Sequence, residues 1–253
     1  MRLISMLALV LCVACTRAPG KAPAAASSVS GLDSVPTPAF PKPARPYPAS
    51  RNYLDEQRRR CQAAFSAGQL DLDSVGRVFT RHFLAEIIPH WYGTAWSFYG
   101  HTELPGQGNI ACGYFVSTTL LHAGLRLNRY RLAQAGPADE ALMLSLGDTV
   151  RVYRGGAAAA LERWRSQLRE GLYFVGLGGS HVGFLLHQAG RLYLLHSNYV
   201  GPVAVQLQPV EESVLMGFQE FYLADITYNR RLMEHWLGGK NIKLEKNGAL
   251  KDW

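Results

Sequence analysis

Cys112 and His181 are the two residues whose types and settings predict covalent chemistry. Cys112 stands at the start of an apolar run, 112–121, that is typical of a helix. A thiol in the first turn of a helix meets unpaired backbone amides and the positive end of the helix dipole. We therefore expect Asn109 to cap the helix and the pKa of the thiol to be lowered. His181 follows two glycines and opens an apolar strand, where it can serve a cysteine nucleophile as its base.

A second histidine and an asparagine are candidates for orienting the His181 ring. Three antiparallel strands are expected at 172–177, 181–187 and 191–197, with tight turns between them. In the second hairpin the start of one strand lies beside the end of the next, which makes His196 a neighbour of His181. Asn198 is the alternative orienter, because residues two apart on a strand share a face. The expected catalytic residues are Cys112, His181 and His196.

The order of these residues resembles the core of NlpC-type cell-wall cysteine peptidases. The similarity runs from residue 91 to residue 225 and includes Ser-His-Val-Gly-Phe-Leu-Leu at 180–186 and Leu-Leu-His-Ser at 194–197. The resemblance implies an α+β, papain-like fold, in which the helix bearing the cysteine packs on a small antiparallel sheet beside additional N-terminal helices. It also implies that Cys112 is the nucleophile, His181 the base and His196 the residue that orients the base.

The same resemblance supplies candidates for substrate binding. The segment 93–100 is similar to the family's Gly-Thr-Pro-Tyr-x-Trp-Gly-Gly motif, with Trp96 in place of the tyrosine that shapes the substrate site. Around the nucleophile the chain has Ala-Cys-Gly-Tyr where the family has Asp-Cys-Ser-Gly, whose Asp and Ser hold a free amine of the wall peptide. An alanine cannot pair with an ammonium group, so a stem peptide with a free N-terminal L-Ala is not the expected ligand. The candidate substrate-binding residues are Trp96, Tyr99, Gly113, Tyr114 and Ser180.

The expected function is that of an exported cysteine hydrolase that cleaves amide bonds, with peptidoglycan peptides as the first substrate class. The altered residues around Cys112 leave two alternatives open. One is a papain-like amidase or acyltransferase that acts on a non-wall substrate. The other is a noncatalytic envelope lipoprotein that binds a peptide or glycan and keeps Cys112 as an inert thiol. No cofactor and no metal are expected, because a thiol and two imidazoles make a catalytic triad without one, although they are also competent zinc ligands.

The first fifty residues predict export and attachment to a membrane. Residues 1–14 are typical of a signal peptide, with a positive charge before an apolar run that is too short to span a bilayer. Residues 11–15 resemble a lipoprotein cleavage site, which implies lipidation of Cys15; cleavage without lipid stays open because Cys12 occupies the usual leucine position. Residues 15–50 are rich in Pro, Ala and Ser and predict a tether. The expected location is the bacterial cell envelope, on an outer membrane facing the periplasm if the envelope is Gram-negative.

One globular domain is expected over 51–240, followed by a solvated basic tail at 241–253. A chain of 253 residues with 48% hydrophobic and 11% aromatic content can bury one core. The net charge of +7 is scattered, without a nucleic-acid fingerprint, so the expected partners are anionic envelope polymers or lipid headgroups rather than nucleic acid. The sequence leaves the oligomeric state open. Helical periodicity predicts helices at 52–68, 70–90, 138–146, 157–170 and 229–237.

Overall fold

The computed structural model describes residue 38 and residues 40–253. The predicted signal peptide, the lipidation site Cys15 and most of the predicted tether lie outside the described residues. None of the helices in the part that is described has the length and apolar character needed to cross a membrane.

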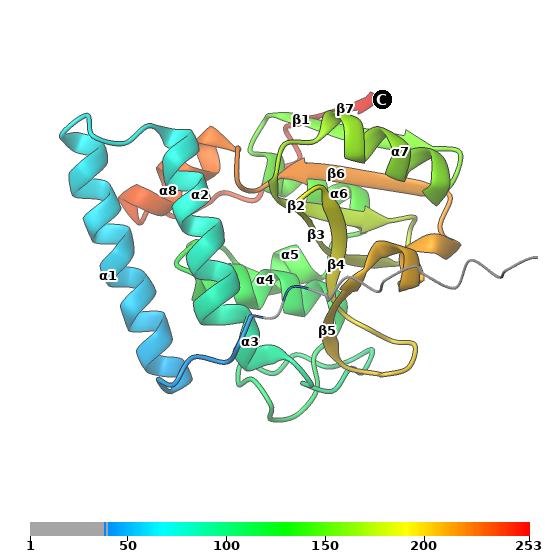
Figure 1. Ribbon diagram of the computed structural model, residues 1–253, viewed down its shortest axis with the longest axis horizontal. Helices are drawn as coiled ribbons and strands as arrows, with labels where there is room; N and C mark the ends of the chain where they lie inside the picture. The colour runs from blue at the N-terminus through cyan, green and yellow to red at the C-terminus, as the bar shows by residue number, and fades with distance from the viewer. Residues whose placement is uncertain (1–37, 39) are drawn as a thin grey trace, which may run out of the picture. The chain divides into compact units, whose positions relative to one another are not determined.

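A mixed seven-stranded sheet forms the centre of the described chain (Figure 1). All neighbouring strands are antiparallel except one parallel pair, β1 and β7. The α+β class is thus confirmed, and the three predicted strands are β2, β3 and β4 of this sheet. In spatial order the strands are β5 (Val205–Pro209), β4 (Arg191–Ser197), β3 (His181–Gln188), β2 (Gly171–Leu177), β6 (Glu220–Asp225), β1 (Thr149–Arg154) and β7 (Ala249–Asp252).

Both faces of the sheet are buried, and alternate residues along a strand supply two separate cores. Phe174 and Phe184 face the larger core, which is shared with the helices that carry the site. Val175 and Leu185 face a smaller core, where α7 (Ala157–Gln167) places Trp164 against the sheet. This division follows from the two-residue period of a strand. The continuous apolar runs of β2, β3 and β4 are the sequence signature of a sheet that is covered on both sides.

Two helices pack closely on one side of the sheet because glycines leave room for them. α4 (Cys112–His122) lies against β3 and β4, and α6 (Pro137–Ser145) lies against β2, β6 and β1. A Cβ atom at Gly176 of β2 would stand 2.8 Å from Cβ of Pro137, at the start of α6. A Cβ atom at Gly113 would stand 2.7 Å from the carbonyl oxygen of Ala133, at the end of α5 (Arg129–Ala133). The first turn of α6 therefore lies against β2, and the first turn of α4 lies against the end of α5.

The N-terminal helices form a second layer against α4. α1 (Tyr47–Ser66) and α2 (Leu72–His82) pack on each other and on α8 (Arg230–Gly238), and α2 continues through a π-helical segment η1 (Phe83–Ile87) into α3 (Ile88–Trp91) (Figure 1). The hydroxyl of Tyr47 accepts a hydrogen bond from the indole of Trp91 and lies 2.8 Å from Nδ1 of His122. α1 thus begins inside the range assigned to the tether, because Tyr47 anchors its first turn to α3 and α4.

Residues 241–253, predicted as a solvated basic tail, are mostly exposed but also contribute two buried side chains and one strand. Ile242 and Leu244 are buried, and residues 249–252 form β7, which pairs with β1. The apolar residues alternate with lysines, so this segment keeps one face in the core while its charges remain in solvent. The predicted helix at 157–170 also ends earlier, at Gln167. Strands β1, β5, β6 and β7 were not predicted from the sequence.

Gly183→Ala should destabilise the fold at the β3–β4 hairpin. The added Cβ would meet the carbonyl oxygen of Leu195 at 2.8 Å and Cβ of His196 at 2.9 Å. Overpacking of this kind costs about 1–3 kcal/mol in the free energy of unfolding, which urea denaturation measures. Gly217→Ala is the matched control, because nothing lies within 4 Å of its Cβ position. Equal urea concentrations at the midpoint of unfolding for the two variants would contradict the prediction.

Candidate active site

Cys112 is the first residue of α4 and lies beside the start of β3. The backbone amide of Val182, the residue after His181, lies against its sulfur. Its position on α4 depends on the segment before it, where the amide of Ala111 donates to the carbonyl of Gly100 at 2.8 Å. The expected Asn109 cap is wrong, since the residue before the helix is Ala111 and no side chain caps the helix start. The first backbone amides of α4 thus remain available at the nucleophile.

His181 and His196 form a buried pair across β3 and β4. Nε2 of His181 lies 2.8 Å from Nδ1 of His196, and the rings meet edge to face. Phe184 pairs with Leu195, so Gly183 is the next residue of β3 towards the site and faces His196. A glycine at this point removes the side chain that would otherwise separate His196 from His181.

The hydroxyl of Ser197 joins the same end of β4 to the segment that leads into Cys112. It donates a hydrogen bond of 2.7 Å to the carbonyl of Ile110, two residues before Cys112. Residues 110 and 197 are far apart in the chain, so this contact sets the distance between α4 and the histidine pair. Ser197 is fully buried, so the bond is shielded from competing water.

Asn198 does not contact His181. Its side-chain nitrogen donates to the carbonyls of Val200 and Pro202, and its side-chain oxygen accepts from the amide of Val200 at 3.1 Å. Asn198 therefore stabilises the turn after β4, beyond the end of the strand. Between the two candidate orienters, the geometry brings only His196 to the His181 ring.

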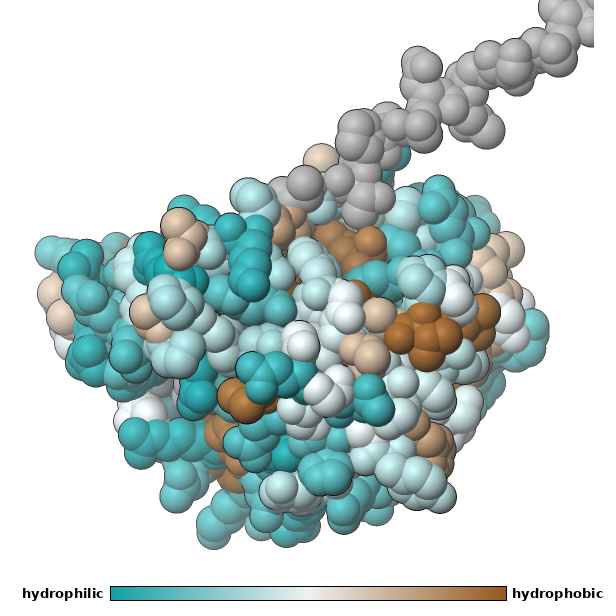
Figure 2. Space-filling view, turned by 90° about the horizontal axis from the view of Figure 1, so that it is seen from below, coloured by the Kyte–Doolittle hydropathy of each residue, from teal (hydrophilic) through white to brown (hydrophobic). Residues whose placement is uncertain are grey.

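An open pocket of about 940 Å³ contains Cys112 and His181. Its rim includes strongly exposed aromatic side chains, and the ring of Tyr199 lies 5.0 Å from that of His181. On the face shown in Figure 2, hydrophobic residues form small, separate groups in a mostly hydrophilic surface. All five predicted substrate-binding residues line the pocket: Trp96, Tyr99, Gly113, Tyr114 and Ser180. The sequence reasoning missed Phe98, His101, Glu140 and Tyr199, which line it too.

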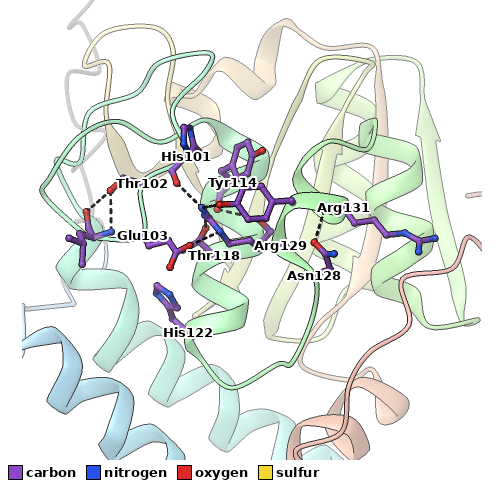
Figure 3. A network of polar contacts seen from close by, with 12 residues as sticks. His101, Thr102, Glu103, Tyr114, Thr118, His122, Asn128, Arg129 and Arg131 are labelled. Atoms are coloured by element: carbon purple, nitrogen blue, oxygen red, sulfur yellow. Dashed lines mark hydrogen bonds and ion pairs between the residues drawn. The ribbon is translucent and has the colours of Figure 1, made fainter.

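Arg129 is a buried cation that holds one wall of this pocket (Figure 3). Its guanidinium donates to the hydroxyl of Thr118 on α4 at 2.7 Å and to the carbonyl of His101 at 2.8 Å. It also pairs with Glu103 at 3.1 Å and lies over the ring of Tyr114. One side chain thus joins α5, α4 and the loop before α4, and it keeps His101 and Tyr114 in place at the pocket.

Burial makes the resting site electrically neutral. It raises the pKa of the Cys112 thiol, and this effect outweighs the backbone amides of Val182 and Gly113, which favour the thiolate. The expectation of a lowered thiol pKa is therefore wrong. Burial also lowers the pKa of His181 and of His196 well below the usual value, and the neighbouring His196 lowers the pKa of His181 further. At neutral pH the site holds a thiol and two neutral imidazoles.

No group of three or more His, Cys, Asp or Glu side chains suited to a metal ion occurs among the described residues. Cys61 and Cys112 are both free thiols, and Cys61 is buried in the core away from the pocket. Cys61 therefore provides an internal control for reactions at Cys112.

We predict that Cys112 reacts slowly with iodoacetamide at neutral pH, because its thiol is protonated there. In the full chain with Cys12, Cys15 and Cys61 changed to Ser, the labelling rate should rise only above the usual thiol pKa of about 8.5. His181→Ala should leave this neutral-pH rate nearly unchanged. Rapid labelling at pH 6 that is lost in His181→Ala would instead show a preformed thiolate–imidazolium pair.

Acid should destabilise the fold through the histidine pair. Both histidines are neutral when folded and have lowered pKa values, whereas in the unfolded chain they bind protons below about pH 6.5. Their stabilising contribution is complete above that pH and is lost as the pH falls towards the folded-state pKa. Between pH 7.5 and pH 5 the free energy of unfolding should fall by about 2 kcal/mol for each histidine. Urea unfolding of His196→Gln should show a smaller fall; an equal fall would contradict the assignment.

No protein-family model matches the chain, and no significant match was found among the curated proteins or the solved structures. The function of this protein is therefore inferred from the geometry of the site, in which Cys112 and His181 line the pocket and His196 contacts His181 from β4.

Proposed function

We propose that this protein is a cysteine hydrolase that cleaves amide bonds, on a papain-like fold resembling that of NlpC-type cell-wall peptidases. The observation that carries the proposal is the hydrogen-bonded pair His181–His196 beside Cys112 in an open pocket. A buried inert thiol needs neither a base nor an orienter, and it has no reason to line a pocket of substrate size. The packing of α4 on an antiparallel sheet, with the thiol at its N-terminus, also supports the papain-like comparison.

The histidine pair suits proton transfer during attack on a carbonyl. With Nε2–H of His181 donating to Nδ1 of His196, Nδ1 of His181 is left to accept the thiol proton. The sulfur of Cys112 then bonds to the amide carbon, and the backbone amide of Cys112 at the helix start stabilises the oxyanion. As the C–N bond breaks, His181 returns the proton to the leaving amine. The acyl group is then held as a thioester on Cys112. His181 takes a proton from a water molecule, which attacks this thioester, and the carboxylic acid and the Cys112 thiol are released.

The neutral resting state determines when the charge appears. Because burial opposes both thiolate and imidazolium, the ion pair forms only as the thiol attacks the substrate. A bound acyl group excludes water, which strengthens the hydrogen bonds to the developing oxyanion. The neutral form also limits oxidation of Cys112 in an oxidising compartment, since the thiolate is the reactive species.

Peptides of the bacterial cell wall are the substrate class that we propose. The support is the resemblance of the 91–225 region to wall peptidases, together with an N-terminal sequence that predicts export and a lipid anchor at Cys15. The pocket is open and large enough for several peptide units, and its aromatic rim offers flat apolar surfaces to a peptide or a sugar.

We predict that Cys112→Ala abolishes release of peptides from purified peptidoglycan, followed by mass spectrometry of the soluble products. The change removes the nucleophile and should leave the fold intact, because Cys112 is only half-buried. Cys61→Ala is the matched control, since it removes a thiol that lies outside the pocket and should keep full activity. His196→Ala should slow the reaction about 100-fold by freeing the His181 ring.

Other outcomes would identify the alternatives. Turnover that persists in Cys112→Ala would remove the mechanism. Cys112-dependent cleavage of simple amides but not of wall peptides would indicate an amidase or acyltransferase with another substrate. Binding of wall fragments without any turnover would indicate a noncatalytic binding protein.

A further inference from the structure

Glu140 is a buried acid beside the nucleophile, and the mechanism above does not use it. It lies on α6, is 2% exposed and lines the pocket. Its Oε1 atom stands 3.1 Å from the position that a Cβ of Gly113 would occupy, immediately after Cys112. Its Oε2 atom is fully buried and has no hydrogen-bond partner among the described residues. Nothing in the described protein therefore stabilises a negative charge on this carboxyl group, and Oε1 is the oxygen on the side of Gly113.

The surroundings of Glu140 keep its carboxyl group neutral. The pocket wall formed by the described residues includes no lysine or arginine. Burial alone raises the pKa of Glu140 well above the usual range. An isolated carboxylate in such a site would cost several kcal/mol, so the group holds a proton and presents an O–H donor.

The charged groups on neighbouring elements are engaged elsewhere. Arg129 of α5 pairs with Glu103, and the Arg151–Asp225 and Arg154–Glu220 pairs join β1 to β6. None of them shifts the pKa of Glu140. Asp139, the neighbour of Glu140 on α6, is paired with Lys246. Across the pocket His181 is neutral at pH 7, and the other titratable side chains are Cys112, His101, Tyr99, Tyr114 and Tyr199.

We propose that Glu140 is a specificity residue that donates a hydrogen bond, as a neutral carboxylic acid, to an oxygen atom of the acyl part of the substrate. The inference rests on the proposed function, because it takes the acyl group to lie against Cys112. The substrate class is an acyl group with a carbonyl or hydroxyl oxygen close to the scissile amide and no ammonium group there.

The chemistry of the nucleophile favours this form over an ionised Glu140 that binds an ammonium group. A negative charge on Glu140 acts against the thiolate of Cys112, which must form during attack. To bind an ammonium group, Glu140 would have to lose its proton and the ammonium group would have to lose its bound water. Each of these two steps costs free energy in a buried site and opposes binding. A neutral O–H donor satisfies the orphan carboxyl group and leaves the thiolate undisturbed.

Peptide binding to the full chain carrying Cys112→Ala tests the proposal without turnover. The probes are N-acetyl-alanyl-alanine amide and alanyl-alanine amide, which differ only in the free amine, and calorimetry measures their Kd. The acetylated probe should bind more tightly. Adding Glu140→Gln keeps an N–H donor and should change its Kd less than about twofold, whereas adding Glu140→Ala should weaken binding at least about tenfold. Asp139→Asn on the same helix is the matched control and should have no effect.

The pH dependence gives a second readout that a purely structural role would not change. Between pH 5 and pH 9, binding of the acetylated probe should weaken as Glu140 loses its proton, and Glu140→Gln should remove that dependence. Tighter binding of the free amine, with loss of that binding in Glu140→Gln, would show an ionised carboxylate and overturn the proposal. Equal Kd values in all variants, or no binding of the acetylated probe, would also overturn it. If the unmodified protein shows no turnover but the acetylated probe still binds in a way that depends on Glu140, the proposed hydrolase function is rejected and the proposed role of Glu140 in binding stands.

Discussion

The contact between His181 and His196 is the constraint on which the site depends. Nε2 of one ring lies 2.8 Å from Nδ1 of the other, and both side chains are buried. Two imidazoles can share this contact only when one ring donates and the other accepts, so the accepting ring is neutral, and burial keeps the donating ring neutral as well. The hairpin register brings the two strands together, and Gly183 gives His196 the room to reach across.

Burial decides the electrostatics of the site, and the local features of α4 are secondary. Backbone amides at the helix start favour a thiolate at Cys112, as a helix dipole should. The loss of water around the sulfur has the larger and opposite effect. A site built in this way holds no charge on the thiol or on either imidazole at neutral pH. Its stability therefore decreases in acid, because the imidazoles bind protons more strongly in the unfolded chain than in the buried site.

The pocket is assembled from segments that are distant in the chain. α4 carries the thiol, β3 and β4 carry the histidines, and α6 brings Glu140 next to Gly113. Arg129 and Ser197 set the spacing by joining α4 to the preceding loop and to β4. Ala111 and Gly113 flank Cys112, and the acid near them, Glu140, comes from another helix.

The sequence by itself determined the local parts of this protein: the three strands β2, β3 and β4, the tight turns between them and the helix that starts at Cys112. Short apolar runs and the glycine turns between them are local signals, and they predicted the neighbouring positions of His181 and His196 correctly. Only the tertiary structure decided the raised pKa of Cys112, the engagement of Asn198 in its own turn, the burial of Glu140 and the pairing of β7 with β1. Each of these features depends on contacts between segments that are distant in the chain, which exclude water from a side chain or pair a backbone. A local sequence pattern does not contain that information.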